Sequence, residues 1–78
     1  MTHDDIWNAI ERFAHAHNLS CSGLARRCGL DPTTFNKSKR YSPNGQPRWP
    51  STQSIAKILS ATNESISGFI SYLPATAA

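Results

Sequence analysis

The chain has 78 residues, a formal net charge of +3 and two cysteines, and 38% of its residues are hydrophobic. A chain of this length forms one domain and buries only about 60% of the surface that its unfolded form exposes, which excludes a large enzyme with a deep cleft. Charged residues make up 17% of the chain, below the usual ~25%, whereas Ser, Thr and Asn supply 21 short polar side chains of the kind that favour helix caps and turns.

No targeting or membrane segment is evident in the sequence. The first residues, Met-Thr-His-Asp-Asp, are acidic where a signal peptide is basic, and no segment approaches the ~18 consecutive apolar residues of a membrane span. The sequence therefore predicts a cytoplasmic protein that has no membrane partner.

The two cysteines are predicted to be free. Cys21 and Cys28 lie in a stretch with a helical pattern, where their spacing separates the Cα atoms by roughly 10.5 Å, and a disulfide spans at most about 7 Å. The chain has no Cys-x-x-Cys pair, and its histidines lie at no recognisable zinc-ligand spacing from the cysteines. We expect no metal and no other cofactor.

Two helices are predicted in the first part of the chain. The first begins at a Thr2 or Asp4 cap and ends near Asn18. The second begins at a Ser20 cap and ends at Gly29, because glycine readily adopts the left-handed conformation that stops a helix. The buried face of the first helix is predicted at Ile6, Ile10, Phe13, Ala14 and His17.

A third helix is predicted from Pro32 to Tyr41, with Asp31 as its cap. The stretch from Ser42 to Pro50 holds three of the five prolines and an Asn-Gly pair, which is typical of a stiff surface loop and not of a strand.

The last two helices begin at serine caps. The fourth follows Ser51, ends at Asn63 and has a buried stripe at Ile55, Ile58 and Leu59. The fifth follows Ser65 and stops before Pro74, with apolar residues at Ile66, Phe69, Ile70 and Leu73. The predicted fold is therefore all-α, a compact bundle of five short helices in residues 1–73, and residues 74–78 form a tail or the start of a linker to a C-terminal domain.

The second and third predicted helices have the pattern of a helix-turn-helix. Ala25 is small where the next helix would cross, Gly29 makes the turn, and the wedge is filled by Leu24, Leu30 and Phe35. In this motif the second helix enters the major groove of DNA. Six cations against Asp31 alone give residues 26–48 a net charge of +5, whereas residues 1–25 carry −2. Positive charge concentrated on the motif itself predicts contact with double-stranded DNA. The alternative is that this charge forms a basic helix face that contacts only solvent.

Two stretches of the sequence resemble the lambda-repressor-like (Xre) DNA-binding domain of bacterial phage-repressor-like regulators. They are Gly-Leu-Asp-Pro-Thr-Thr-Phe-Asn-Lys-Ser-Lys-Arg (29–40) and Arg-Trp-Pro-Ser-Thr (48–52), and the resemblance covers roughly Ile6 to Leu73. In that group a LexA-like peptidase domain often follows. Ser38 departs from the pattern, because the family usually has an apolar residue there; the third helix is then shorter, or Tyr41 takes over the packing.

The resemblance implies a transcriptional regulator, a repressor, and assigns roles to individual residues. The base-contacting positions correspond to Thr33, Asn36 and Lys37, with Thr34 as a weaker candidate, and their side chains suit contacts with adenine, guanine and the thymine methyl. The alternative for Thr33 and Thr34 is that they only stabilise the first helical turn. Phosphate contacts are expected from the flanks, at Ser20, Ser22, Lys39, Arg40, Arg48 and Trp49. Trp49 has an alternative as a lid over the core.

The expected partner is an inverted-repeat operator bound by a homodimer, with half-sites about one helical turn, ~34 Å, apart. Ile70 and Leu73 of the fifth predicted helix are the candidate dimer surface. The alternative function is a helix-turn-helix that binds a protein, as in an antitoxin or anti-activator, but that interpretation predicts a neutral or apolar face. Catalysis is not expected, because the three histidines lie on the first predicted helix without a recognisable triad or carboxylate pair.

Overall fold

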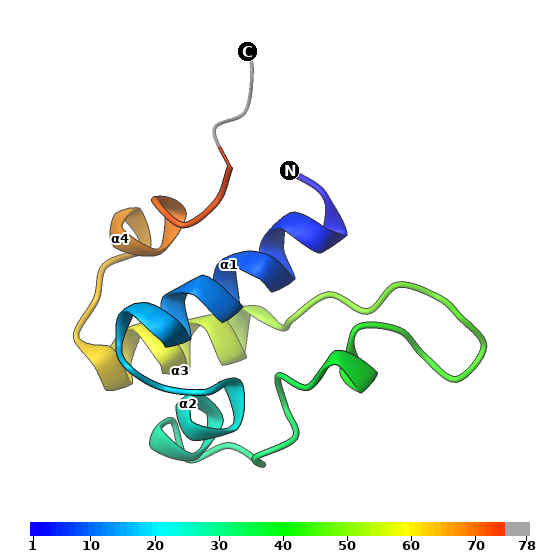
Figure 1. Cartoon of the computed structure of the whole chain (residues 1–78), viewed down its shortest axis with the longest axis horizontal. Coiled ribbons are helices and arrows are strands. Elements are labelled where there is room, and N and C mark those ends of the chain that lie inside the picture. Colours follow the sequence, from blue (N-terminus) through cyan, green and yellow to red (C-terminus); the bar gives the residue numbers. More distant parts are fainter. Residues whose placement is uncertain (75–78) are drawn as a thin grey trace.

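The computed structural model describes residues 1–74 and contains four α-helices and one 3-10 turn (Figure 1). In chain order these are α1 (His3–Ala16), α2 (Cys21–Arg27), the 3-10 turn η1 (Lys37–Lys39), α3 (Thr52–Thr62) and α4 (Ile66–Ile70). Over these 74 residues the only β-type pairing is an isolated bridge between Tyr41 and Pro47, so the all-α prediction is confirmed there. None of the described helices is long and apolar enough to cross a membrane. The predicted tail, apart from Pro74, lies outside the described residues.

The predicted caps start all four α-helices. Each cap accepts a hydrogen bond through its side-chain oxygen from the backbone N–H three residues later, and the caps are Thr2, Ser20, Ser51 and Ser65. Three helices end on a left-handed residue, with φ of 59° at Asn18, 72° at Gly29 and 58° at Asn63. Because these interactions join residues close in sequence, the short polar side chains determine where the helices begin and end.

The predicted third helix, Pro32 to Tyr41, does not form, so the five-helix prediction was wrong. Pro32 to Phe35 make a single turn in which the Thr34 N–H donates to the Asp31 carbonyl over 2.9 Å. Asn36 is then extended, with φ −67° and ψ 152°, and interrupts the helical path before η1. The Thr33 and Thr34 hydroxyls both donate back to Asp31, at 2.7 and 2.6 Å. Such local bonds compete with helix propagation.

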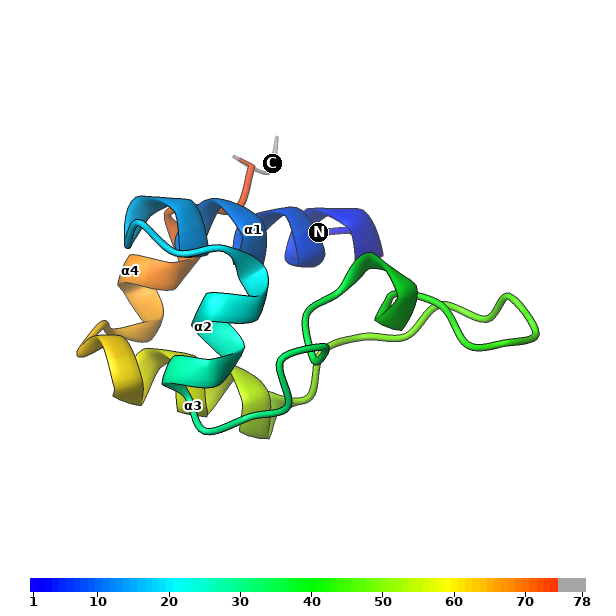
Figure 2. The same ribbon diagram turned by 60° about the horizontal axis from the view of Figure 1, so that its bottom comes forward.

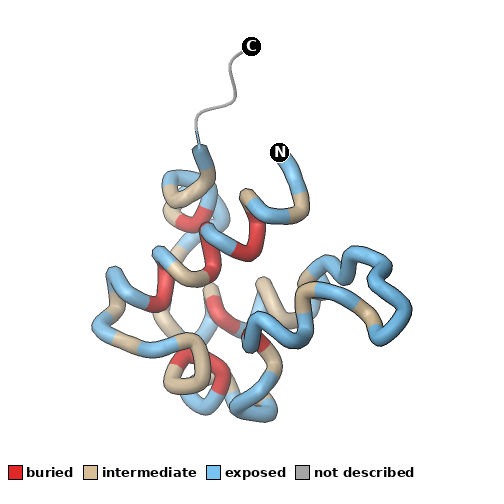
Figure 3. The backbone as a smooth tube through the Cα atoms, turned by 45° about the vertical axis from the view of Figure 1, so that its right-hand side comes forward, coloured by how far each residue is buried: buried red, intermediate tan, exposed pale blue. Residues whose placement is uncertain are grey.

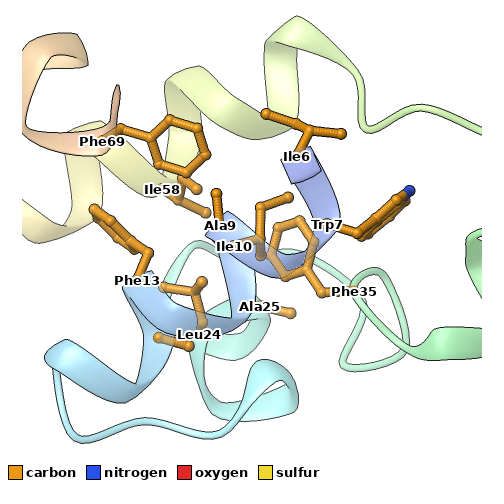
Figure 4. Packing of buried hydrophobic residues seen from close by; sticks show 11 residues of the cluster. Ile6, Trp7, Ala9, Ile10, Phe13, Leu24, Ala25, Phe35, Ile58 and Phe69 are labelled. Atoms are coloured by element: carbon orange, nitrogen blue, oxygen red, sulfur yellow. The ribbon is translucent and has the colours of Figure 1, made fainter. Parts of the chain in front are cut away.

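Helix α1 lies at the centre of the core. It packs against α2 and α4, and α2 packs against α3 (Figure 2). The predicted buried face is confirmed at Ile6, Ile10, Phe13 and Ala14, whereas His17 is only half-buried at the end of α1. Trp7 and Ala9 are also buried on α1, although they lie outside the predicted face. The other buried apolar residues are Leu24, Ala25, Phe35, Ile58 and Phe69 (Figure 4).

Candidate nucleic-acid interface

A loop projects from the helices directly after η1, the turn that carries Lys37 and Lys39 (Figures 1 and 3). The loop is closed at its neck, where the Arg48 N–H donates to the Arg40 carbonyl over 2.8 Å. Beyond the neck, the Ser42 N–H donates to the Gln46 carbonyl over 2.8 Å, and Gly45 has a φ of 82° that allows the chain to reverse. As predicted, residues 42–50 form a surface loop and no strand.

Two clefts lie at the base of this loop, and three exposed cations line them: Lys37, Lys39 and Arg48. We call these three cations the basic face. The first cleft, of about 390 Å³, includes Trp49 and the start of α3. The second cleft, of about 580 Å³, includes Tyr41. Lys39 and Arg48 line both clefts, and the two aromatic side chains are half-exposed, Trp49 at 53% and Tyr41 at 48%. Positive charge beside accessible aromatic rings suits a polyanion that also offers planar or sugar surfaces.

Among the residues that line the two clefts, the acidic one is Asp31, in the first cleft. Its carboxylate accepts hydrogen bonds from the Thr33 hydroxyl and the Thr33 N–H, and these bonds, helped by the charge of Lys39, hold the pKa of Asp31 below 3.8. Asp31 therefore stabilises the turn that carries Thr33 and Thr34.

The Asp31 turn is expected to loosen in acid. Because the pKa of Asp31 is lowered by folding, its contribution is present above the unfolded value of 3.8 and is lost as the pH falls through the lower folded value. We expect the protection factor of the Thr33 amide, which compares its exchange rate with that of an unstructured amide at the same pH, to fall below that pH, as measured by NMR hydrogen exchange. In Asp31→Asn this protection factor should show no such pH dependence, and a Thr33 protection factor unchanged by acid in the original chain would contradict the assignment.

The predicted base-contacting residues lie along one segment. Thr33 and Thr34 line the first cleft, Lys37 lines the second, and Asn36 is exposed between them. Both threonine hydroxyls donate to Asp31. The methyl groups therefore remain as the parts of these side chains that are not engaged within the turn.

The predicted phosphate contacts are divided between the basic face and other surfaces. Lys39, Arg48 and Trp49 belong to the clefts. Ser20 and Ser22 lie at the start of α2, where Ser20 accepts the Gly23 N–H, and they line neither cleft.

Arg40 is turned toward α1. Its guanidinium donates to the Glu11 carboxylate over 3.1 Å and lies 5.7 Å from the centre of the Trp7 ring, and its side chain is only 13% exposed. The ion pair joins the end of the 31–40 segment to the central helix. We therefore leave Arg40 out of the basic face.

The site also contains residues that the sequence analysis did not single out. Tyr41, expected only to pack, lines the second cleft, and Ser54 of α3 lines the first. Their positions depend on how the loop closes against α1 and α3, so no local pattern indicates them.

Both cysteines are free, as predicted, and half-buried. Burial raises the pKa of both thiols, and Glu11 raises that of Cys21 further, while Arg40 and Lys37 act in the opposite direction. Within residues 1–74 no three His, Cys, Asp or Glu side chains are grouped to hold a metal ion.

A comparison of the chain with models of known families, with characterised proteins and with solved structures finds no match.

Proposed function

We propose that the chain is the sequence-specific, double-stranded-DNA-binding domain of a transcriptional repressor. The observation that carries the proposal is the basic face, in which three exposed cations line two clefts beside exposed Trp49 and Tyr41. Cations that neutralise phosphates release counterions from DNA, and this release supplies much of the binding free energy. An interaction with a neutral protein surface would not need this arrangement of charge.

In this proposal α2 and the segment from Asp31 to Lys39 act as a helix-turn-helix-like unit, although the second element is a turn followed by η1. Asn36 and Lys37 donate to base edges, with adenine and guanine as their preferred partners. The free methyl groups of Thr33 and Thr34 contact thymine methyls.

Phosphate contacts in this proposal come from Lys39 and Arg48 of the basic face and from Trp49 beside them in the first cleft. Ser20 and Ser22 at the start of α2 contact the backbone at the flank. Arg40 serves the binding surface indirectly, through its ion pair with Glu11.

A homodimer on an inverted repeat completes the proposal. On α4, Ile66 and Ile70 are 55% and 53% exposed, whereas Leu73 is half-buried against the core. A second copy that covers the exposed isoleucines would pair two basic faces.

The proposal is tested by measuring duplex affinity against salt, with a duplex selected from a random pool. We expect two chains per selected duplex and a log–log slope of about −0.9 for each phosphate contact. Affinity that does not change with salt, or a pool from which no preferred sequence emerges, would contradict it.

Lys37→Ala is expected to relax base preference. Removing one base contact should reduce discrimination at a single base pair by about 1–3 kcal/mol, while binding to other sequences changes little. The measurement is a selection followed by affinities for single-base variants of the selected site. The control is Lys57→Ala, which removes an exposed lysine from α3 outside the clefts; base preference that changes equally in both variants would argue against this role for Lys37.

A further inference from the structure

The neck of the projecting loop is held against the first turns of α1 by hydrogen bonds from two side-chain rings, those of His3 and Trp7. His3 Nε2 lies 2.8 Å from the carbonyl oxygen of Arg40 and 2.8 Å from that of Arg48. Trp7 Nε1 donates to the same Arg48 carbonyl, also over 2.8 Å. These contacts join residues that lie 37 to 45 positions apart in the chain.

The two carbonyls determine which nitrogen of His3 carries a proton. A carbonyl oxygen only accepts, so an Nε2 in contact with two of them carries hydrogen and donates to both. The Trp7 N–H is then directed to the Arg48 carbonyl and not to His3 Nε2, which lies 3.1 Å away. In Figure 4 the Trp7 indole nitrogen points away from the apolar cluster.

The His3 ring also touches the aromatic side chains of the interface. Its centre lies 5.0 Å from the Tyr41 ring and 5.7 Å from the Trp49 ring, and its side chain is only 12% exposed. His3 therefore contacts both walls of the neck and one exposed aromatic residue of each cleft, although it lines neither cleft.

We propose that His3 is a positioning residue for the basic face. Its Nε2–H holds the Arg40 and Arg48 carbonyls together, and this fixes where the Arg48 side chain and Trp49 are presented. The effect on DNA rests on the proposed function above, whereas the restraint on the neck stands on the geometry alone. The alternative is that the imidazole acts only as a flat ring that fills space.

Two substitutions separate these roles. His3→Gln keeps an N–H donor and loses the aromatic ring, whereas His3→Phe keeps a ring and loses the donor. The matched controls are His15→Gln and His15→Phe, because His15 is exposed on the same helix. Each variant of the full chain is compared by hydrogen exchange of the Arg48 amide, which donates across the neck, and by duplex affinity against salt.

We expect the Arg48 amide to exchange about fivefold faster in His3→Phe, and close to the original rate in His3→Gln, because the hydrogen bond that Nε2 shares between the Arg40 and Arg48 carbonyls is lost only in the first. The unsubstituted chain should show a His3 Nε2–H proton signal that exchanges slowly with water. His3→Phe should also lower the salt slope of duplex binding by up to about one, with recovery in His3→Gln. The His15 variants should match the original chain.

Three results would overturn the proposal. The first is an Arg48 amide as slow in His3→Phe as in the original chain. The second is faster exchange spread equally over the buried amides of α1 and α2, which would mean general destabilisation. The third is a freed Arg48 amide with an unchanged salt slope. If the original chain shows no salt-dependent duplex binding, the proposed function fails, while the exchange rates still decide whether His3 holds the neck.

Discussion

Phe13→Ala is expected to lower the free energy of unfolding by about 3–5 kcal/mol. The Phe13 side chain is fully buried, and its ring centre lies 5.7 Å from that of Phe69 and 5.6 Å from that of Tyr72. Truncation removes the contacts by which α1 holds α4 and leaves a cavity between them. A domain has only about 5–15 kcal/mol of stability in total, and a short chain lies toward the lower end, so a large fraction of this variant should be unfolded.

Urea denaturation followed by circular dichroism measures this effect. The control is Ile70→Ala, because Ile70 is 53% exposed on α4 and its loss should change stability by less than about 0.5 kcal/mol at low protein concentration. Equal effects of the two substitutions would contradict the placement of Phe13 at the centre of the core.

The double substitution Lys39→Ala/Arg48→Ala is expected to have the largest effect on binding. These two side chains line both clefts, so their loss leaves Lys37 as the remaining cation of the basic face. Each phosphate contact contributes about 0.9 to the slope of log affinity against log salt, and the slope should fall by about two for each chain bound to the duplex. Affinity should fall for all duplex sequences, because phosphate contacts carry no base preference.

A matched control has the same change in net charge. Arg12→Gln/Lys57→Ala removes two cations from α1 and α3. The introduced glutamine keeps an N–H donor for the Tyr72 carbonyl, to which Arg12 donates over 3.2 Å. This control should leave the salt slope close to its original value. A slope that falls equally in both double variants would mean that net charge, and not the basic face, attracts DNA.

The candidate site was predictable only in part. The run of cations was visible in the sequence, and the structure brings Lys37, Lys39 and Arg48 to a common surface. Arg40 belongs to the same run but faces α1, because Glu11, 29 residues earlier, pairs with it. Charge counted along the chain therefore identifies residues 26–48 as basic. It does not say which of these cations are free to contact a ligand.

Local patterns by themselves determined the four helices that form. The caps at Thr2, Ser20, Ser51 and Ser65 and the left-handed Asn18, Gly29 and Asn63 act over at most five residues, so the sequence carries all the information they need.

Tertiary contacts determined the conformation of the segment from Asp31 to Arg48. Its helix signals end with Asn36, and Ser38 offers no apolar side chain that could anchor a longer helix to the core. The partners that hold its far end are His3, Trp7 and Glu11, all on α1. Hydrogen bonds across 29 to 45 residues leave no periodic pattern in the sequence, because they depend on the folded position of α1.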